Sequence, residues 1–237
     1  MTVASKGAAS FSSGLRGGAI IAFARLRSRS FGVSFALASA LTIVGALVER
    51  RMGPSGAVDR SLGLVFSWVI PLLTLATLSV VVGPRSLRDA TWPIARFGAP
   101  RALCALGVVG ATMAACALAS VVLTLLAVTI GHAPSSAPLL GDLATSAWIS
   151  GLTGSAYAAF FAFGATLGRA GGGRSVILAL DFVLGRTELF GVVLPRGNAA
   201  NLIGVGSSLE ASQRTSSILL VGVAVFVALI ATWRSRD

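Results

Sequence analysis

Residues 62–83, LGLVFSWVIPLLTLATLSVVVG, contain no charged side chain. About 20 apolar residues in a helix are enough to cross the hydrocarbon core of a bilayer. The rest of the chain has the same character, since 55% of its 237 residues are hydrophobic and 11% are charged. Soluble domains carry roughly 25% charged residues. The composition therefore predicts an all-α integral membrane protein that crosses the bilayer several times.

Five further apolar segments accompany this stretch. The six expected transmembrane helices lie at 31–48, 62–83, 102–131, 144–168, about 175–193 and 216–233. The fifth is the weakest, because it contains Asp181, Arg186 and Glu188, and it either spans poorly or is a broken helix. Residues 186–215 are too apolar for a solvent loop. We expect short outer helices or a re-entrant element there, between helices five and six.

The distribution of positive charge predicts the orientation. With six spans and both termini in the cytoplasm, thirteen of the 19 lysine and arginine residues lie on the inner side, as the positive-inside rule requires. The expected location is therefore the cell (inner) membrane, as a multi-pass protein. The net charge of +11 does not indicate nucleic-acid binding, because the arginines punctuate apolar runs instead of gathering on one face of a polar domain.

Residues 1–30 are expected to form a cytoplasmic tail and a basic interfacial segment, ahead of a six-helix transmembrane domain over 31–237. Three arginines, at positions 25, 27 and 29, stand beside apolar residues just before the first span. Arg25, Arg27 and Arg29 can bind lipid phosphate while their neighbours enter the lipid. An ordinary topogenic basic flank would have the same composition. Glycines at positions 14, 17 and 18 weaken the expectation of a helix upstream.

A charged interruption, RSLRDATWPIARFGAPRAL at 85–103, separates the second and third spans. Thr91 can cap a short surface helix, and Pro93 is tolerated in its first turn. Gly98 suits the end of that helix. The helix would present six residues to the cytoplasm: Arg88, Asp89, Trp92, Ile94, Arg96 and Phe97. From the residues alone, the stretch could equally be a juxtamembrane loop that anchors tryptophan and arginine at the lipid interface.

The same stretch resembles the cytoplasmic coupling helix of type-2 permeases of ATP-binding-cassette exporters. Asp89 precedes Ala90 and Thr91, and Gly98-Ala99-Pro100-Arg101 opens the third span. In that family an acidic residue stands close to Gly-Thr, and a Pro-x-Ser-Arg or similar motif opens the third span. The six-span architecture is also similar, with a basic surface segment before the first span and an apolar outer element before the last.

The resemblance implies a transport function for a chain that cannot itself use ATP. No G-x-x-x-x-G-K-[ST] motif occurs, so the phosphate cradle is missing and the chain is not expected to be an enzyme. ATP and Mg would bind to a separate ATPase subunit, which would contact the 85–101 loop through Arg88, Asp89, Thr91, Trp92, Ile94, Arg96 and Phe97. A second permease chain would complete the transport pathway. Haem-exporter permeases of cytochrome c maturation share this outline.

Asp181 supports a different hypothesis, because it is a carboxylate well inside an apolar run. It could serve a secondary carrier, or it could pair structurally with Arg169, Arg174 or a backbone donor. A non-transporting membrane scaffold or assembly factor is the third alternative. Neither a metal site nor a disulfide framework is expected, because the chain has a single histidine, His132, and two cysteines, Cys104 and Cys116, within one apolar segment.

Overall fold

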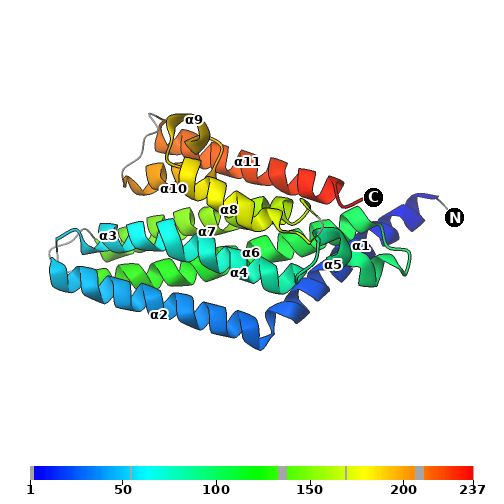
Figure 1. The fold of residues 1–237 in the computed structure, drawn as a ribbon, viewed down its shortest axis with the longest axis horizontal. Helices are drawn as coiled ribbons and strands as arrows, with labels where there is room; N and C mark the ends of the chain where they lie inside the picture. The colour runs from blue at the N-terminus through cyan, green and yellow to red at the C-terminus, as the bar shows by residue number, and fades with distance from the viewer. Residues whose placement is uncertain (1–2, 54, 133–137, 169, 206–210, 237) are drawn as a thin grey trace.

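The computed structural model describes residues 3–53, 55–132, 138–168, 170–205 and 211–236, with side chains from residue 12 onward. Every regular element in these ranges is helical, which confirms the all-α prediction for them (Figure 1). The elements are α1 (Val3–Leu26), α2 (Arg29–Met52), α3 (Ala57–Leu64), the π-helix η1 (Val65–Val69), α4 (Ile70–Val82), α5 (Leu87–Ala95), α6 (Arg101–Gly131), α7 (Leu139–Gly164), α8 (Gly173–Leu184), α9 (Glu188–Gly191), α10 (Pro195–Ile203) and α11 (Gln213–Trp233).

Four stretches of the described chain are long and apolar enough to cross a membrane. They are Arg29–Met52, Ala57–Ala95, Arg101–Gly131 and Gln213–Trp233. Helix α7 is not among them, although its 26 residues give it the length. These helices indicate a membrane protein. A soluble domain rarely exposes large apolar patches, whereas helices that cross a bilayer carry apolar side chains along their length.

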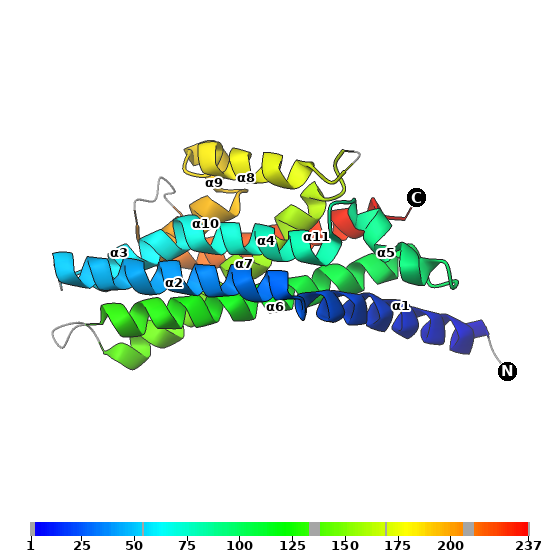
Figure 2. The same cartoon turned by 60° about the horizontal axis from the view of Figure 1, so that its bottom comes forward.

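The segment expected at about 175–193 is a broken helix, one of the two possibilities that the sequence left open. Helix α8 has 12 residues and reaches about 18 Å at 1.5 Å per residue, well short of the ~30 Å hydrocarbon core. It ends where the Gly185 amide donates to the Asp181 carbonyl. Thr187 then caps α9 by accepting from the Phe190 amide at 3.4 Å. Helix α10 follows and packs against α7, α11 and η1 (Figure 2).

Helices α3, η1 and α4 form one continuous rod that contains a π-helical turn. Pro71 explains this turn, because proline has no amide proton and its ring collides with the carbonyl four residues earlier in an α-helix. Widening the turn over Val65–Val69 removes that collision. The extra residue also changes which side chains of the rod face α8 and α10, and those include Ser67 and Trp68.

Helix α1 continues through Gly14, Gly17 and Gly18, where the sequence predicted a weak helix, and it packs closely on α6. The backbones touch, because a Cβ at Gly18 would overlap the Cys104 carbonyl and a Cβ at Gly107 would overlap the Leu15 carbonyl. Glycine permits this approach between helices. The expectation that these glycines weaken the helix is therefore wrong, since packing against α6 offsets their low helix propensity.

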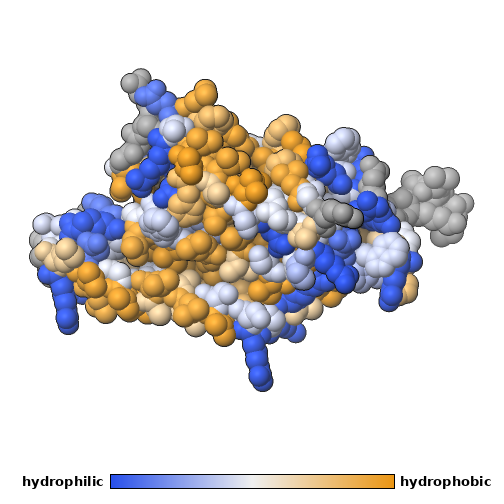
Figure 3. All heavy atoms as spheres, in the orientation of Figure 1, coloured by the Kyte–Doolittle hydropathy of each residue, from blue (hydrophilic) through white to orange (hydrophobic). Residues whose placement is uncertain are grey.

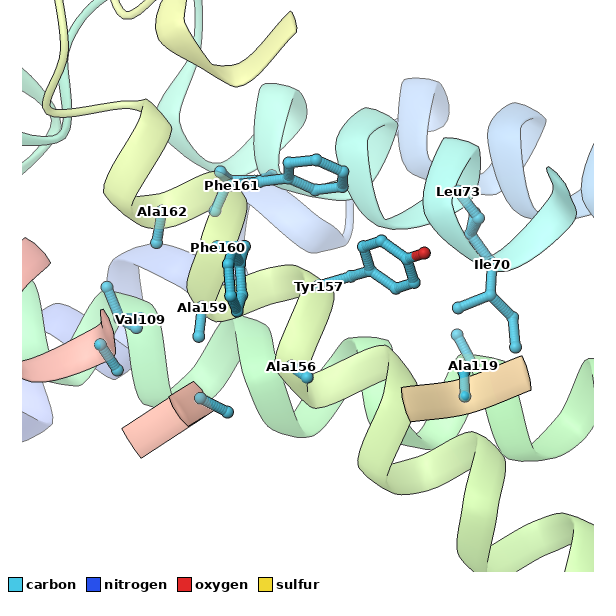
Figure 4. Close-up of a cluster of buried hydrophobic side chains, with 14 of the residues drawn as sticks. Ile70, Leu73, Val109, Ala119, Ala156, Tyr157, Ala159, Phe160, Phe161 and Ala162 are labelled. Atoms are coloured by element: carbon cyan, nitrogen blue, oxygen red, sulfur yellow. The ribbon is translucent and has the colours of Figure 1, made fainter. Parts of the chain in front are cut away.

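The core lies between α4, α6 and α7. Tyr157 and Phe161 stack along α7, with ring centroids 5.7 Å apart, and Ile70 and Leu73 of α4 face Tyr157 (Figure 4). Outside this core, large apolar side chains of α2 and α11 remain exposed, including Leu37, Leu41, Ile218 and Phe226. Apolar residues occupy the middle of the face drawn in Figure 3, and hydrophilic residues gather toward its two ends. Helices that cross a bilayer are expected to have such a surface, with an apolar band in the lipid and polar residues at both ends.

Candidate functional site

Helix α5 begins with a capping box at Ser86, the residue before its first turn. Ser86 Oγ accepts a hydrogen bond from the Asp89 amide at 3.3 Å, and Asp89 Oδ2 accepts one from the Ser86 amide at 3.3 Å. This reciprocal pair satisfies two amides that the helix cannot satisfy itself. The prediction that Thr91 caps the helix is wrong, because the Ser86 box starts it earlier. Thr91 is buried and donates to the Arg88 carbonyl at 2.8 Å.

The outward face of α5 and the turn after it combine aromatic rings with guanidinium groups. Trp92 is 54% exposed and Phe97 is 78% exposed. Arg96 Cζ lies 4.8 Å from the centroid of the Phe97 ring, and Arg101 Cζ lies 5.2 Å from that of Trp92. Arg88 and Asp89 are also exposed. We call Arg88, Trp92, Arg96 and Phe97 the α5 surface.

The inward face of α5 is fixed to three other parts of the bundle. The Leu87 amide donates to the Ala165 carbonyl at the end of α7, at 3.1 Å. Ile94, expected on the outer surface, lies instead against α1, where a Cβ at Gly17 would come within 2.8 Å of its Cδ1. Arg174 Nη2 at the start of α8 donates to the Gly83 carbonyl at 3.0 Å, just before α5. These contacts connect α5, or the residues just before it, to α1, α7 and α8.

The three arginines of the basic segment have two different environments. Arg27 and Arg29 are exposed at the break between α1 and α2, as lipid anchors would be. Arg25 turns inward, and its Nη1 donates to the Val81 carbonyl near the end of α4. Partial burial lowers the pKa of Arg25, but a guanidinium remains charged in proteins. Arg25 therefore ties α1 to α4 through this bond.

Asp181 is buried near the end of α8 and has two hydrogen-bond donors. The Tyr157 hydroxyl donates to its Oδ2 at 2.8 Å, and the Arg196 amide donates to its Oδ1 at 3.2 Å. The carboxylate thus joins α8 to α7 and to the first turn of α10. A backbone donor was one of the expected partners. Arg174, another of them, bonds elsewhere, and Arg169 lies outside the described residues.

A second polar group was not predicted from the sequence. It lies at the end of the bundle away from α5, where Arg186 Nη2 donates to Ser67 Oγ at 3.2 Å. Arg196 is buried beside it, with its Cζ 4.2 Å from the Phe182 ring centroid and 5.8 Å from that of Trp68. Ser67 and Trp68 lie more than a hundred positions from Phe182, Arg186 and Arg196 in the chain, and no local pattern connects the two sets.

Within the described residues, no group of three or more His, Cys, Asp and Glu side chains could hold a metal ion. Cys104 and Cys116 are buried free thiols there. No family model matches the chain, no curated protein matches it, and no solved structure matches it.

Proposed function

We propose that this chain is the membrane-spanning permease subunit of an ATP-binding-cassette exporter, driven by a separate ATPase that contacts residues 85–101. The α5 surface carries the proposal, because it joins exposed aromatic rings and arginines on a short, capped helix between two long apolar helices. Aromatic residues and arginine are enriched where proteins bind one another. The charge of Arg88 and Arg96 would suit an acidic rim on the ATPase.

The anchoring of α5 supports a mechanical role. Its contacts through Leu87, Ile94 and the neighbouring Arg174 connect it to three helices of the bundle, α7, α1 and α8. ATP-driven closure of two ATPase subunits would draw two such helices together and tilt the attached bundles as rigid bodies. One chain would form half of a pathway, so a second permease chain is part of the proposal.

Six passes through the membrane fit this function. The first four would be α2, the α3–η1–α4 rod, α6 and α7, and the last would be α11. The fifth would be α8, which crosses only part of the membrane. Helices α9 and α10 would follow it as the expected outer or re-entrant element and pack back against the bundle. Helix α1 begins, and helix α11 ends, at the end of the bundle where α5 lies (Figure 1). The excess of arginine on that side favours a cytoplasmic position for both.

The two alternatives have less support. A secondary carrier would use Asp181, but the two hydrogen bonds that this carboxylate accepts support a structural role. In a scaffold protein, Trp92 would lie in lipid as an interfacial anchor, and no ATPase would bind α5. Both alternatives are separated from the permease proposal by where α5 lies and what binds it.

A labelling experiment tests the position of α5. Single cysteines at Phe97→Cys and Leu140→Cys would be compared after Cys104 and Cys116, both buried, are replaced by alanine. Phe97 and Leu140 are 78% and 80% exposed. Phe97 follows α5 and Leu140 lies in the first turn of α7, and these two helix ends lie at opposite ends of the bundle (Figure 1). A membrane-impermeant maleimide should label position 97 only in inside-out vesicles and position 140 only in right-side-out vesicles. Labelling of position 97 from outside would reject the proposal.

A binding experiment tests the partner. The chain would be co-expressed with its adjacent reading frames and purified with any ATPase that they encode, with and without Trp92→Ala and Phe97→Ala. The double variant should lose most of the ATPase while the chain stays in the membrane. Trp148→Ala is the matched control, since Trp148 is 63% exposed on α7. Equal recovery of the ATPase with all variants would show that the α5 surface does not bind it.

A further inference from the structure

A hollow of about 410 Å³ opens at the end of the bundle away from α5. It lies between the end of α2, the α3–η1 rod and the turn after α8, and Glu49, Asp59, Arg60, Ser67, Trp68 and Arg186 are among its lining residues. Glu49 Oε2 pairs there with Arg60 Nε at 2.7 Å, which leaves Asp59 and Arg186 as the other two charged residues of the lining. The size is that of a small-molecule site.

A small cavity of about 10 Å³ continues the hollow inward, and the two share Ser67, Arg186 and Val205. Arg196 also lines it, and this side chain is 7% exposed. The ring centroids of Phe182 and Trp68 lie 4.2 Å and 5.8 Å from its Cζ, and the Asp181 carboxylate accepts from its amide. Its Nε and Nη1 still lack an acceptor among the described residues, which is costly for buried donors, and no acidic residue lines this cavity. Its volume suits one oxygen-sized group, and its charge favours an anion.

An apolar groove of about 230 Å³ runs from the hollow along the membrane-facing side of the bundle. It lies between α2 and α4, and Leu37, Leu41, Leu72 and Leu73 are among its lining residues. Trp68 lines both the hollow and the groove. The π-helical turn η1 carries both Ser67 and Trp68, so one local irregularity serves the polar and the apolar part. Such turns often mark functional positions.

We propose that the cavity, the hollow and the groove are one binding site for an anionic phospholipid. A phosphate oxygen would bind Arg196 and Arg186 in the small cavity. The rest of the headgroup would fill the hollow, and an acyl chain would lie in the groove against Trp68. Binding does not depend on the permease function; only the further step, that this lipid class is the cargo, rests on the proposed function.

The test uses Trp68 as a reporter in the purified full-length chain in mild detergent. The other tryptophans, all more than half exposed, are replaced by phenylalanine: Trp92→Phe, Trp148→Phe and Trp233→Phe. Quenching of Trp68 fluorescence is then titrated with phosphatidylglycerol and with phosphatidylcholine, each brominated on its acyl chains. No ATPase is present, so a negative result here leaves the permease proposal intact, and failure of the permease proposal leaves this result intact.

Phosphatidylglycerol should bind at least about fivefold more tightly than phosphatidylcholine, since an arginine near an anionic headgroup contributes about that factor. Arg186→Gln should remove about fivefold of the affinity for phosphatidylglycerol, and Arg196→Gln more, because its guanidinium is buried. Arg214→Gln, an exposed arginine at the start of α11, is the control and should change nothing. If Arg196→Gln does not fold, the affinities of Arg196→Lys and Arg186→Gln for phosphatidylglycerol test the proposal in its place.

The groove is tested separately with Ala76→Phe, which fills it, and with Leu118→Phe, on the exposed face of α6. Ala76→Phe should weaken both lipids, and Leu118→Phe neither. Equal affinity for the two lipids, or an unchanged affinity in Arg186→Gln, would overturn the proposal. Displacement of phosphatidylglycerol by inorganic phosphate at the same concentration would also overturn it, because it would show that the acyl chain contributes nothing.

Discussion

The Tyr157 hydroxyl donates a 2.8 Å hydrogen bond to Asp181 Oδ2, across the contact between α7 and α8. Asp181 Oδ1 also accepts from the Arg196 amide, in the first turn of α10. One carboxylate thus joins α8 to α7 and to the first turn of α10. Because α8 is too short to span alone, this junction fixes the shape of the broken fifth segment.

Tyr157→Phe should destabilise the protein by about 1–2 kcal/mol. The variant keeps the ring in the core but leaves Asp181 Oδ2 without its donor, and interhelical hydrogen bonds in membranes contribute up to about that amount. Thermal unfolding in detergent measures the effect. Ser155→Ala is the control, since the Ser155 hydroxyl donates within its own helix, to the Leu152 carbonyl. An equal melting temperature for Tyr157→Phe and the parent would show that the bond is not structural.

Asp181→Asn separates the structural role from a proton-carrying role. Asparagine keeps the shape and one acceptor, so the chain should fold with reduced stability. The ATPase activity of the complex should stay within about twofold of the parent, because the carboxylate carries no proton in the proposed mechanism. Complete loss of transport in a folded Asp181→Asn variant would instead favour the secondary carrier.

The sequence predicted the long helices well, because length and hydropathy are local properties. The expected spans at 102–131 and 216–233 correspond to α6, Arg101–Gly131, and α11, Gln213–Trp233. The partners of Asp181 could not be predicted in the same way. Tyr157 and Arg196 are remote from it in sequence, and only the packing of α7, α8 and α10 brings them together.

The candidate site shows the same division. Its short helix and its exposed Trp92 and Phe97 agree with the sequence. The inward turns of Arg25, Thr91 and Ile94 were missed, because each depends on a neighbour elsewhere in the bundle or on the earlier start of α5. A pattern of residue types predicts that a surface helix exists, but packing decides which of its side chains face the solvent.

Ser86→Ala should loosen the start of α5 by about 1 kcal/mol, because it removes one half of the capping box. Hydrogen exchange of the amides at 87–90 should rise, and the rest of the bundle should be unchanged. Ser217→Ala is the control, since Ser217 bonds to the Gln213 carbonyl inside its own helix. If the ATPase binds the α5 surface, its presence should restore protection in Ser86→Ala.

Two glycines of α6 offer a matched pair that tests how α1 is held. Gly107→Ala should destabilise the chain, because the added methyl group would overlap the Leu15 carbonyl of α1. Gly110→Ala should be neutral or stabilise by up to about 1 kcal/mol, because nothing lies within 4 Å of its Cβ position and alanine has the higher helix propensity. Limited proteolysis should release α1 faster in Gly107→Ala only. Equal proteolysis rates and melting temperatures for the two variants would show that α1 does not rest on α6 through this contact.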